Sequence, residues 1–150
     1  MGTYVNPGNQ AFSRINGKNY VDKTKLIEAM NERVGGGESL VCVSRPRRFG
    51  KSYAVKMLTA YYDCSCDSHR LFDDKEIAKA DSYEEHLNQY NVICLDVSSF
   101  VSEARATQRP LVEVPRMIME ALGEDLRHEY PQIPEDKTLN DGLLACVSLP

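Results

Sequence analysis

Three stretches of the chain, residues 25–34, 51–62 and Pro110 to about His128, repeat apolar side chains at the spacing of one helix face. The repeat follows positions i, i+3, i+4 and i+7, which is the pattern of an amphipathic helix. In the first stretch the apolar residues are Leu26, Ile27, Met30 and Val34. We therefore predict three amphipathic helices.

Two short apolar runs predict strands instead. Residues 39–44 (SLVCVS) and 92–97 (VICLDV) are rich in β-branched residues, as expected for strands of a parallel sheet buried on both faces. A polar loop is predicted over 63–70, with short helices near 73–80 and 82–88. The order strand, loop, helix, strand, helix predicts an α/β fold with a parallel sheet flanked by helices.

The loop before the second helix carries the most specific chemistry of the chain. Residues 44–52 read SRPRRFGKS, and the triplet Gly50-Lys51-Ser52 matches the end of the phosphate-binding pattern G-x-x-x-x-G-K-[ST]. Glycine permits a tight turn, lysine reaches the β- and γ-phosphates, and the serine hydroxyl binds Mg²⁺. The helix that follows adds partial positive charge at its amino end. We therefore expect a nucleoside triphosphate site here.

Arg45 stands where this pattern has its first glycine. A side chain fits at this position if φ stays negative, and Pro46 favours an extended backbone before it. Two interpretations follow: a phosphate-binding loop with a variant start, or a solvated basic turn. The three arginines exceed what a phosphate loop needs, so one could stack on nucleotide, meet an acidic partner or nucleic acid, or stay solvated.

A second motif makes the combination more specific. Residues 20–27 read YVDKTKLI and follow GNQAFSRI at 8–15, which contains a GNxxFxxI context, and Tyr61-Tyr62 precede Leu71-Phe72. Together with RPRRFGKS, these residues resemble the bacterial predicted AAA-ATPase-like family. The resemblance covers nearly the whole chain. In that family arginine is the usual residue at position 45.

The resemblance implies the N-terminal part of a P-loop NTPase-type domain that binds ATP and Mg²⁺. Residues 1–34 are then an N-terminal segment and helix, and residues 35–150 the first part of an ATPase domain. Related proteins are longer and usually continue into a domain like a restriction nuclease. Their acidic strand, which holds Mg²⁺ and activates water, comes later, so we expect this chain to be a fragment. The implied nucleotide-binding residues are Arg45, Pro46, Arg47, Arg48, Phe49, Gly50, Lys51 and Ser52, with Ser52 as the Mg²⁺ ligand.

No residue is assigned to catalysis. Asp96 ends the second apolar run and is one candidate for an acid linked to Mg²⁺, but Val97 follows where an acid pair needs a second carboxylate. The alternative is that Asp96 caps a turn. Without a residue that activates water, most of the barrier to hydrolysis remains. We therefore expect binding of ATP–Mg²⁺ with little or no turnover.

The YVDKT motif allows two interpretations. Its residues Asp22, Lys23 and Thr24 precede a predicted helix and can cap it. The family resemblance, in which N-terminal segments lie near the base, suggests instead that Tyr20 or its neighbours line an adenine pocket.

A cluster in the predicted polar loop offers three possible metal ligands. Cys64, Cys66 and His69 have the spacing C-x-C-x-x-H, whereas a structural zinc site needs four ligands with wider cysteine spacing. The alternative is a polar loop with reduced thiols.

Composition and charge exclude some classes of protein and indicate a cellular compartment. The net charge of −4 argues against a protein that coats nucleic acid, and no apolar run reaches the length of a membrane span. Five cysteines without an export signal indicate a reducing cytoplasm.

A sheet of two or three strands would leave edges uncovered, so self-association or a partner is expected. The alternative function is a non-catalytic interaction module whose basic loop binds nucleic acid or an acidic partner.

Overall fold

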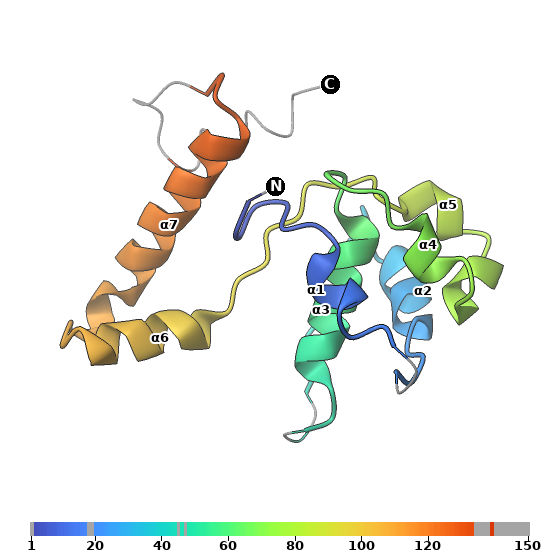
Figure 1. Cartoon of the computed structure of the whole chain (residues 1–150), viewed down its shortest axis with the longest axis horizontal. Helices are drawn as coiled ribbons and strands as arrows, with labels where there is room; N and C mark the ends of the chain where they lie inside the picture. Colours follow the sequence, from blue (N-terminus) through green and yellow to red (C-terminus); the bar gives the residue numbers. More distant parts are fainter. Residues whose placement is uncertain (1, 18–19, 45, 47, 134–138, 140–150) are drawn as a thin grey trace. The chain divides into compact units, whose positions relative to one another are not determined.

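The computed structural model describes residues 2–17, 20–44, 46, 48–133 and 139. The chain forms two compact units (Figure 1). One comprises residues 8–92, and the other comprises residues 1–7 together with 93–150.

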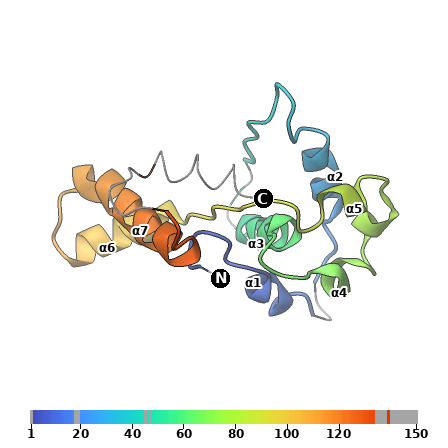
Figure 2. The ribbon, with the colours of Figure 1, turned by 90° about the horizontal axis from the view of Figure 1, so that it is seen from above.

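Helices form the unit of residues 8–92, and α3 lies at its centre. Its elements are α1 (Gln10–Ser13), α2 (Lys25–Asn31), α3 (Lys51–Tyr62), α4 (His69–Phe72), the 3₁₀ helix η1 (Glu76–Lys79) and α5 (Tyr83–His86). Helix α1 packs beside α3 (Figure 2). The core gathers side chains from all of these elements: Phe12, Ile27, Met57, Ala60, Tyr61, Phe72, Ile77, Tyr83 and Leu87.

The carboxyl end of α3 is held by the segment that follows α5. The last carbonyls of a helix have no partner within it. Here the side-chain amide of Asn88 donates to the carbonyl of Asp63 at 2.7 Å, and the backbone N–H of Asn88 donates to the carbonyl of Tyr61 at 2.7 Å. Asn88 itself has a φ of +57°, a left-handed conformation that asparagine tolerates better than most residues. Together with the N–H of Tyr90, which donates to the Tyr62 carbonyl at 2.9 Å, Asn88 therefore closes the end of the central helix.

The start of α2 is fixed by the YVDKT motif. The Asp22 carboxylate accepts from the backbone N–H of Thr24 at 2.8 Å and from that of Glu76 at 2.9 Å. The buried Thr24 hydroxyl donates to Asp22 and accepts from the N–H of Ile77 at 3.1 Å. Burial pushes the pKa of Asp22 up, but these donors outweigh it, and the pKa is lowered. The predicted cap is therefore a clamp between α2 and η1, and the Thr24 side chain makes no capping bond within α2.

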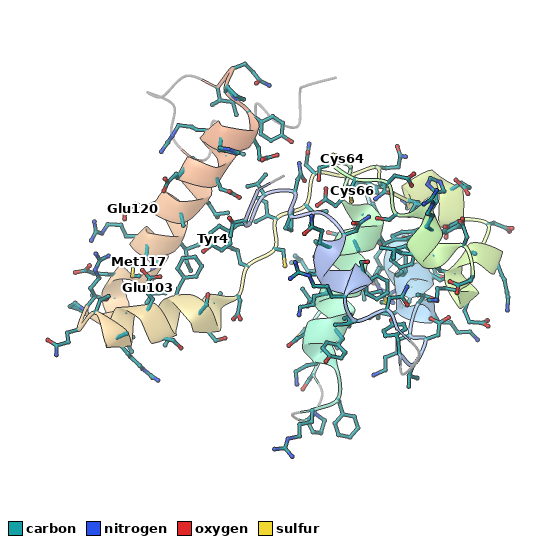
Figure 3. All side chains as sticks on the ribbon, in the orientation of Figure 1. Tyr4, Cys64, Cys66, Glu103, Met117 and Glu120 are labelled. Carbon is teal, nitrogen blue, oxygen red and sulfur yellow. The ribbon has the colours of Figure 1, made fainter. Side chains whose placement is uncertain are left out.

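The second unit contains α6 (Val97–Ala106), the 3₁₀ helix η2 (Leu111–Glu113) and α7 (Val114–Glu129). Helix α6 packs against α7, and Tyr4 from the N-terminal segment packs against the Phe100 and Met117 cluster between them (Figure 3). The Asp125 carboxylate on α7 accepts from the backbone N–H groups of residues 3, 4 and 5 at 2.7–2.9 Å. Residues 3–5 are thus tied to α7.

The predicted parallel sheet is wrong. In the described part of the chain, extended backbone pairs only through two isolated bridges, Val5 with Ile93 and Asp63 with Tyr90. Residues 39–44 form no strand and are exposed, and Leu40 is 98% exposed. An apolar run favours burial, but a strand also needs a neighbour that completes its backbone hydrogen bonds. Within the described residues, 39–44 has none, and the core around α3 is filled by helices instead.

The helix predictions fared better. The prediction over 51–62 is confirmed residue for residue by α3. The helix predicted over 25–34 is confirmed as α2 but ends at Asn31, and the long C-terminal helix divides into η2 and α7. Helix α6 was not predicted, because its first residue lies in the apolar run read as a strand. Within the described residues, no helix is both long and apolar enough to cross a membrane.

Replacing Asn88 is expected to destabilise the unit of residues 8–92. In Asn88→Gly the backbone conformation stays favourable but the amide cap is lost, which costs about 2 kcal/mol. In Asn88→Ala the left-handed conformation adds about 1 kcal/mol more. Urea unfolding of the two variants and the parent measures both terms. Equal stability of Asn88→Gly and the parent would show that the cap contributes nothing.

The hold of Asp125 on residues 3–5 is expected to weaken in acid. Partial burial would raise the pKa of this carboxyl, but the N–H groups of Val5, Thr3 and Tyr4 outweigh it, and the pKa is lowered. The stabilisation is then complete above about pH 4 and is lost as the pH falls through the lowered pKa. Hydrogen exchange of amides 3–5 should show protection at pH 7 that persists below the ordinary pKa of an aspartate and disappears as the pH falls through the lowered pKa of Asp125.

Asp125→Asn is the matched control for this pH dependence. Its neutral amide accepts more weakly and does not titrate, so protection of amides 3–5 should already be reduced at pH 7 and stay constant with pH. Parent-like protection at pH 7 in this variant would contradict the assigned role of the carboxylate.

Candidate functional site

The motif Gly50-Lys51-Ser52 forms the amino end of α3. Gly50 is the residue before the helix and has a φ of +78°, and Arg48 has a φ of +70°. The N–H groups of Tyr53 and Ala54 donate to the Gly50 carbonyl at 3.1 and 2.9 Å, which opens the helical hydrogen bonding. First-turn amides of a helix point away from its body, and the helix dipole makes this end partially positive. This end therefore presents donors and positive charge.

A hollow of about 450 Å³ lies at this helix end. Its lining comes from Arg48, Gly50, Lys51, Ser52 and Tyr53. The Lys51 ammonium donates to the Pro46 carbonyl at 3.2 Å, so this side chain spans the loop. A guanidinium, an ammonium and a hydroxyl thus border one solvent-accessible space, which suits an anion rich in oxygen.

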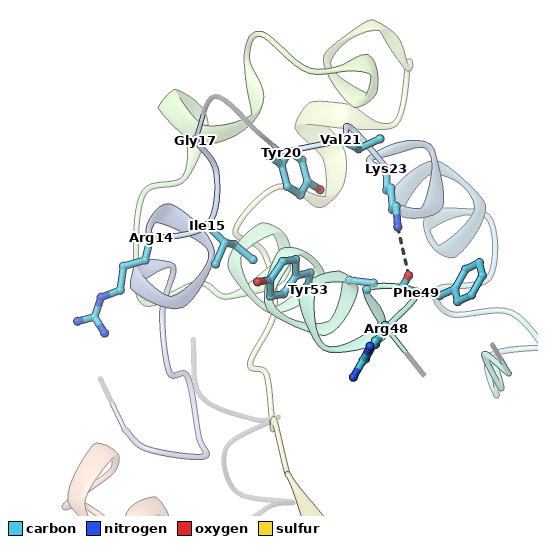
Figure 4. Close-up of a pocket in the computed structure, with 11 residues that line it drawn as sticks. Arg14, Ile15, Gly17, Tyr20, Val21, Lys23, Arg48, Phe49 and Tyr53 are labelled. Atoms are coloured by element: carbon cyan, nitrogen blue, oxygen red, sulfur yellow. Dashed lines mark hydrogen bonds between the residues drawn. The ribbon is translucent and has the colours of Figure 1, made fainter. Parts of the chain in front are cut away.

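A larger hollow of about 770 Å³ adjoins the same loop (Figure 4). It shares Arg48, Gly50 and Tyr53 with the smaller one. Its other lining residues are Arg14, Ile15, Gly17, Tyr20, Val21, Lys23, Phe49 and Ala54. The rings of Phe49 and Tyr53 are more than half exposed here. The larger hollow combines the aromatic residues Tyr20, Phe49 and Tyr53 with the basic residues Arg14, Lys23 and Arg48, and we call it the aromatic hollow. The smaller one, lined by Arg48 and Lys51 but by only one aromatic residue, we call the basic hollow.

Tyr20 forms one wall of the larger hollow. Its ring meets Phe12 edge to face with centroids 5.3 Å apart, and its hydroxyl donates to the Met57 sulfur at 3.1 Å. Burial raises the pKa of the Tyr20 phenol above its usual value, with the Asp22 carboxylate adding to the effect and a backbone hydrogen bond from Lys23 opposing it. Tyr20 is thus neutral at physiological pH and is anchored in the core behind the hollow.

Lys23 links the two sequence motifs. Its ammonium donates to the Phe49 carbonyl at 3.2 Å (Figure 4). A side chain added at Gly50 would meet the Lys23 nitrogen at 3.1 Å, so the absence of a side chain there permits this approach. The YVDKT motif therefore lies against the GKS loop, a contact that its residue types did not reveal.

The structure brings most of the predicted nucleotide-binding residues together. Pro46, Arg48, Phe49, Gly50, Lys51 and Ser52 belong to one loop and the first turn of α3. Arg45 and Arg47 lie outside the described residues. Sequence reasoning did not name Arg14, Lys23 or Tyr53 as lining residues. The family resemblance, which suggested that Tyr20 or its neighbours lie near the base, was the one signal that pointed toward Lys23.

Asp96 belongs to the other unit and caps a helix. Its carboxylate accepts from the backbone N–H of Ser98 at 2.9 Å and from the Ser98 hydroxyl, and it precedes α6. These bonds from Ser98 lower the pKa of Asp96. Its observed contacts are those of a helix N-cap, whereas the alternative left open by the sequence was the cap of a turn.

The C-x-C-x-x-H cluster makes no metal site within the described residues. The His69 ring bonds to Asp67 at 2.7 Å and to Glu84 at 3.4 Å. The Cys64 thiol donates to the Asn91 side chain, and the Cys66 thiol to the Asp63 carbonyl (both cysteines are labelled in Figure 3). In the described part of the chain no three potential ligands gather to hold a metal ion. Burial raises the pKa of both thiols, which favours the unreactive protonated form.

Comparison with known proteins identifies the family. Residues 7–148 match the family model described as Predicted AAA-ATPase. The chain belongs to this family. No curated protein and no solved structure matches it. Membership in the predicted AAA-ATPase family is consistent with nucleotide binding in general.

Gly50→Ala is expected to destabilise this predicted AAA-ATPase by about 1–2 kcal/mol. The left-handed conformation at Gly50 disfavours any side chain, and the Lys23 ammonium leaves little space. Gly37→Ala is the matched control, because nothing lies within 4 Å of a side chain there and its φ is not left-handed. Urea unfolding should show a loss for Gly50→Ala and none for Gly37→Ala. Equal stability of the two variants would contradict the strained loop.

Proposed function

We propose that this chain binds ATP with Mg²⁺ at the amino end of α3. The observation that carries the proposal is the hollow where a left-handed glycine, a lysine and a serine meet at the exposed start of α3, a helix whose second half is buried. The residues proposed to bind nucleotide are Arg45, Pro46, Arg47, Arg48, Phe49, Gly50, Lys51 and Ser52.

The two hollows suit the two ends of a nucleotide. Phosphates would enter the basic hollow, where Lys51 and Arg48 offer cationic donors and first-turn amides offer neutral ones. The base would enter the aromatic hollow, whose volume lies within the usual range for small-ligand pockets. Tyr20 would form its rigid wall and Tyr53 an exposed face on which a base can stack. This division supports a nucleotide over a simple anion.

Mg²⁺ fits the same place. Its preferred ligands are oxygens, and the Ser52 hydroxyl is the oxygen that the first turn of α3 supplies at the basic hollow. Bound there with phosphate oxygens, the ion would neutralise part of the triphosphate charge. The proposal concerns binding, and it assigns no residue of this chain to hydrolysis.

Thermal unfolding with and without ATP–Mg²⁺ tests the proposal. Ligand that binds only the native state stabilises it by about 2.7 kcal/mol at a concentration one hundred times Kd. We expect the unfolding midpoint of the parent to rise by several degrees and that of Lys51→Ala to stay unchanged. Lys25→Ala is the control, because Lys25 is an exposed lysine at the start of α2 outside both hollows.

Two outcomes would contradict this function. A shift of equal size in Lys51→Ala would place the nucleotide elsewhere on the chain. A cooperative transition of the parent with no shift would favour the interaction module, in which the basic loop binds nucleic acid or an acidic partner. Adding a short single-stranded oligonucleotide in place of ATP separates these two partners.

A further inference from the structure

We propose that Lys23 is a second lysine of the nucleotide site. Its side chain positions the loop before α3, and its charge contributes to phosphate binding. The inference rests on the proposed function, because it assigns a further residue to that same site.

The backbone around Lys23 is fixed on both sides. Asp22 accepts from the N–H groups of Thr24 and Glu76, and the Thr24 hydroxyl accepts from Ile77. Thr24 is fully buried, whereas Lys23 is exposed. Two short polar side chains thus anchor this segment to η1, and the long side chain between them extends to the loop before α3 (Figure 4). An anchored backbone reduces the entropy lost when such a side chain holds a ligand.

The Lys23 ammonium lies where the loop turns into the helix. It bonds to the Phe49 carbonyl at 3.2 Å and lies 3.1 Å from the place where a side chain of Gly50 would begin. Lys51 makes a bond of the same kind to the Pro46 carbonyl at 3.2 Å. Two lysines from separate segments of the chain therefore hydrogen-bond to backbone carbonyls of one short loop.

The chemistry of the ammonium leaves capacity for a ligand. A lysine has three donors, and the Phe49 carbonyl takes one of them. In the part of the chain that the structure describes, no carboxylate pairs with Lys23. Its charge is thus not neutralised by a described carboxylate. Lys23 lines the aromatic hollow, and its ammonium lies beside Gly50, a residue that lines both hollows. Phosphate oxygens are the ligand class that this placement suits.

Calorimetric titration of the whole chain tests this role, with ATP–Mg²⁺ and with adenosine as separate ligands. Lys23→Met keeps the length of the side chain and removes its charge, and we expect Kd for ATP–Mg²⁺ to rise about tenfold. Kd for adenosine should stay within about twofold, because adenosine carries no phosphate. Lys23→Arg restores the charge and should keep Kd for ATP–Mg²⁺ within about threefold of the parent.

Lys25→Met is the matched control, because it removes an exposed lysine two residues away that lines neither hollow. Equal affinities of Lys23→Met and Lys25→Met for ATP–Mg²⁺ would overturn the role of Lys23 and leave the proposed function intact. A parent that binds no ATP–Mg²⁺ would overturn both. An equal rise in Kd for adenosine in Lys23→Met would also overturn the role of Lys23 in phosphate binding, because the substitution would then have altered the whole hollow. Lys23→Gln serves as the second uncharged variant if Lys23→Met does not fold.

Discussion

The candidate site depends on the way in which α3 is held at one end and presented at the other. Met57 and Tyr61 bury one face of this helix, and Asn88 closes its last carbonyls through bonds that reach across 25 residues or more. A helix anchored in this manner cannot slide or rotate without opening the core. Its amino end is therefore a rigid base for the loop before it, although that loop is exposed.

A second anchor brings the N-terminal motif to the same place. The side chains of Asp22 and Thr24 accept hydrogen bonds from backbone N–H groups of η1. The conformation of residues 22–24 is therefore set by a distant element and not by α2 alone. From this fixed segment, Lys23 bonds to the loop before α3, and the nearby Tyr20 lines the larger hollow. Two motifs that are about 25 residues apart in sequence thus contribute to one surface. One is positioned by α3 and the other by the hydrogen bonds of Asp22 and Thr24.

The sequence predicted what is local and missed what is tertiary. Helix α3 could be predicted residue for residue, because its apolar period is regular and Gly50 marks its start. The strand at 39–44 was wrong, because its apolar residues imply burial but say nothing about a pairing partner, and Leu40 is exposed. Helix α6 was missed because Asp96 caps it from inside an apolar run. The Lys23–Phe49 bond joins residues 26 apart and leaves no local pattern.

The tie between residues 3–5 and α7 also sets an order of events during synthesis. Val5 bonds to Asp125, which leaves the ribosome 120 residues later, and bridges to Ile93. At about 5–20 residues per second, the first residues wait on the order of ten seconds for their partner. Residues 8–92 are complete well before then and hold their own core. Residues 8–92 can thus fold first. Residues 3–5 are made before them but can pack only later, once α7 has been synthesised.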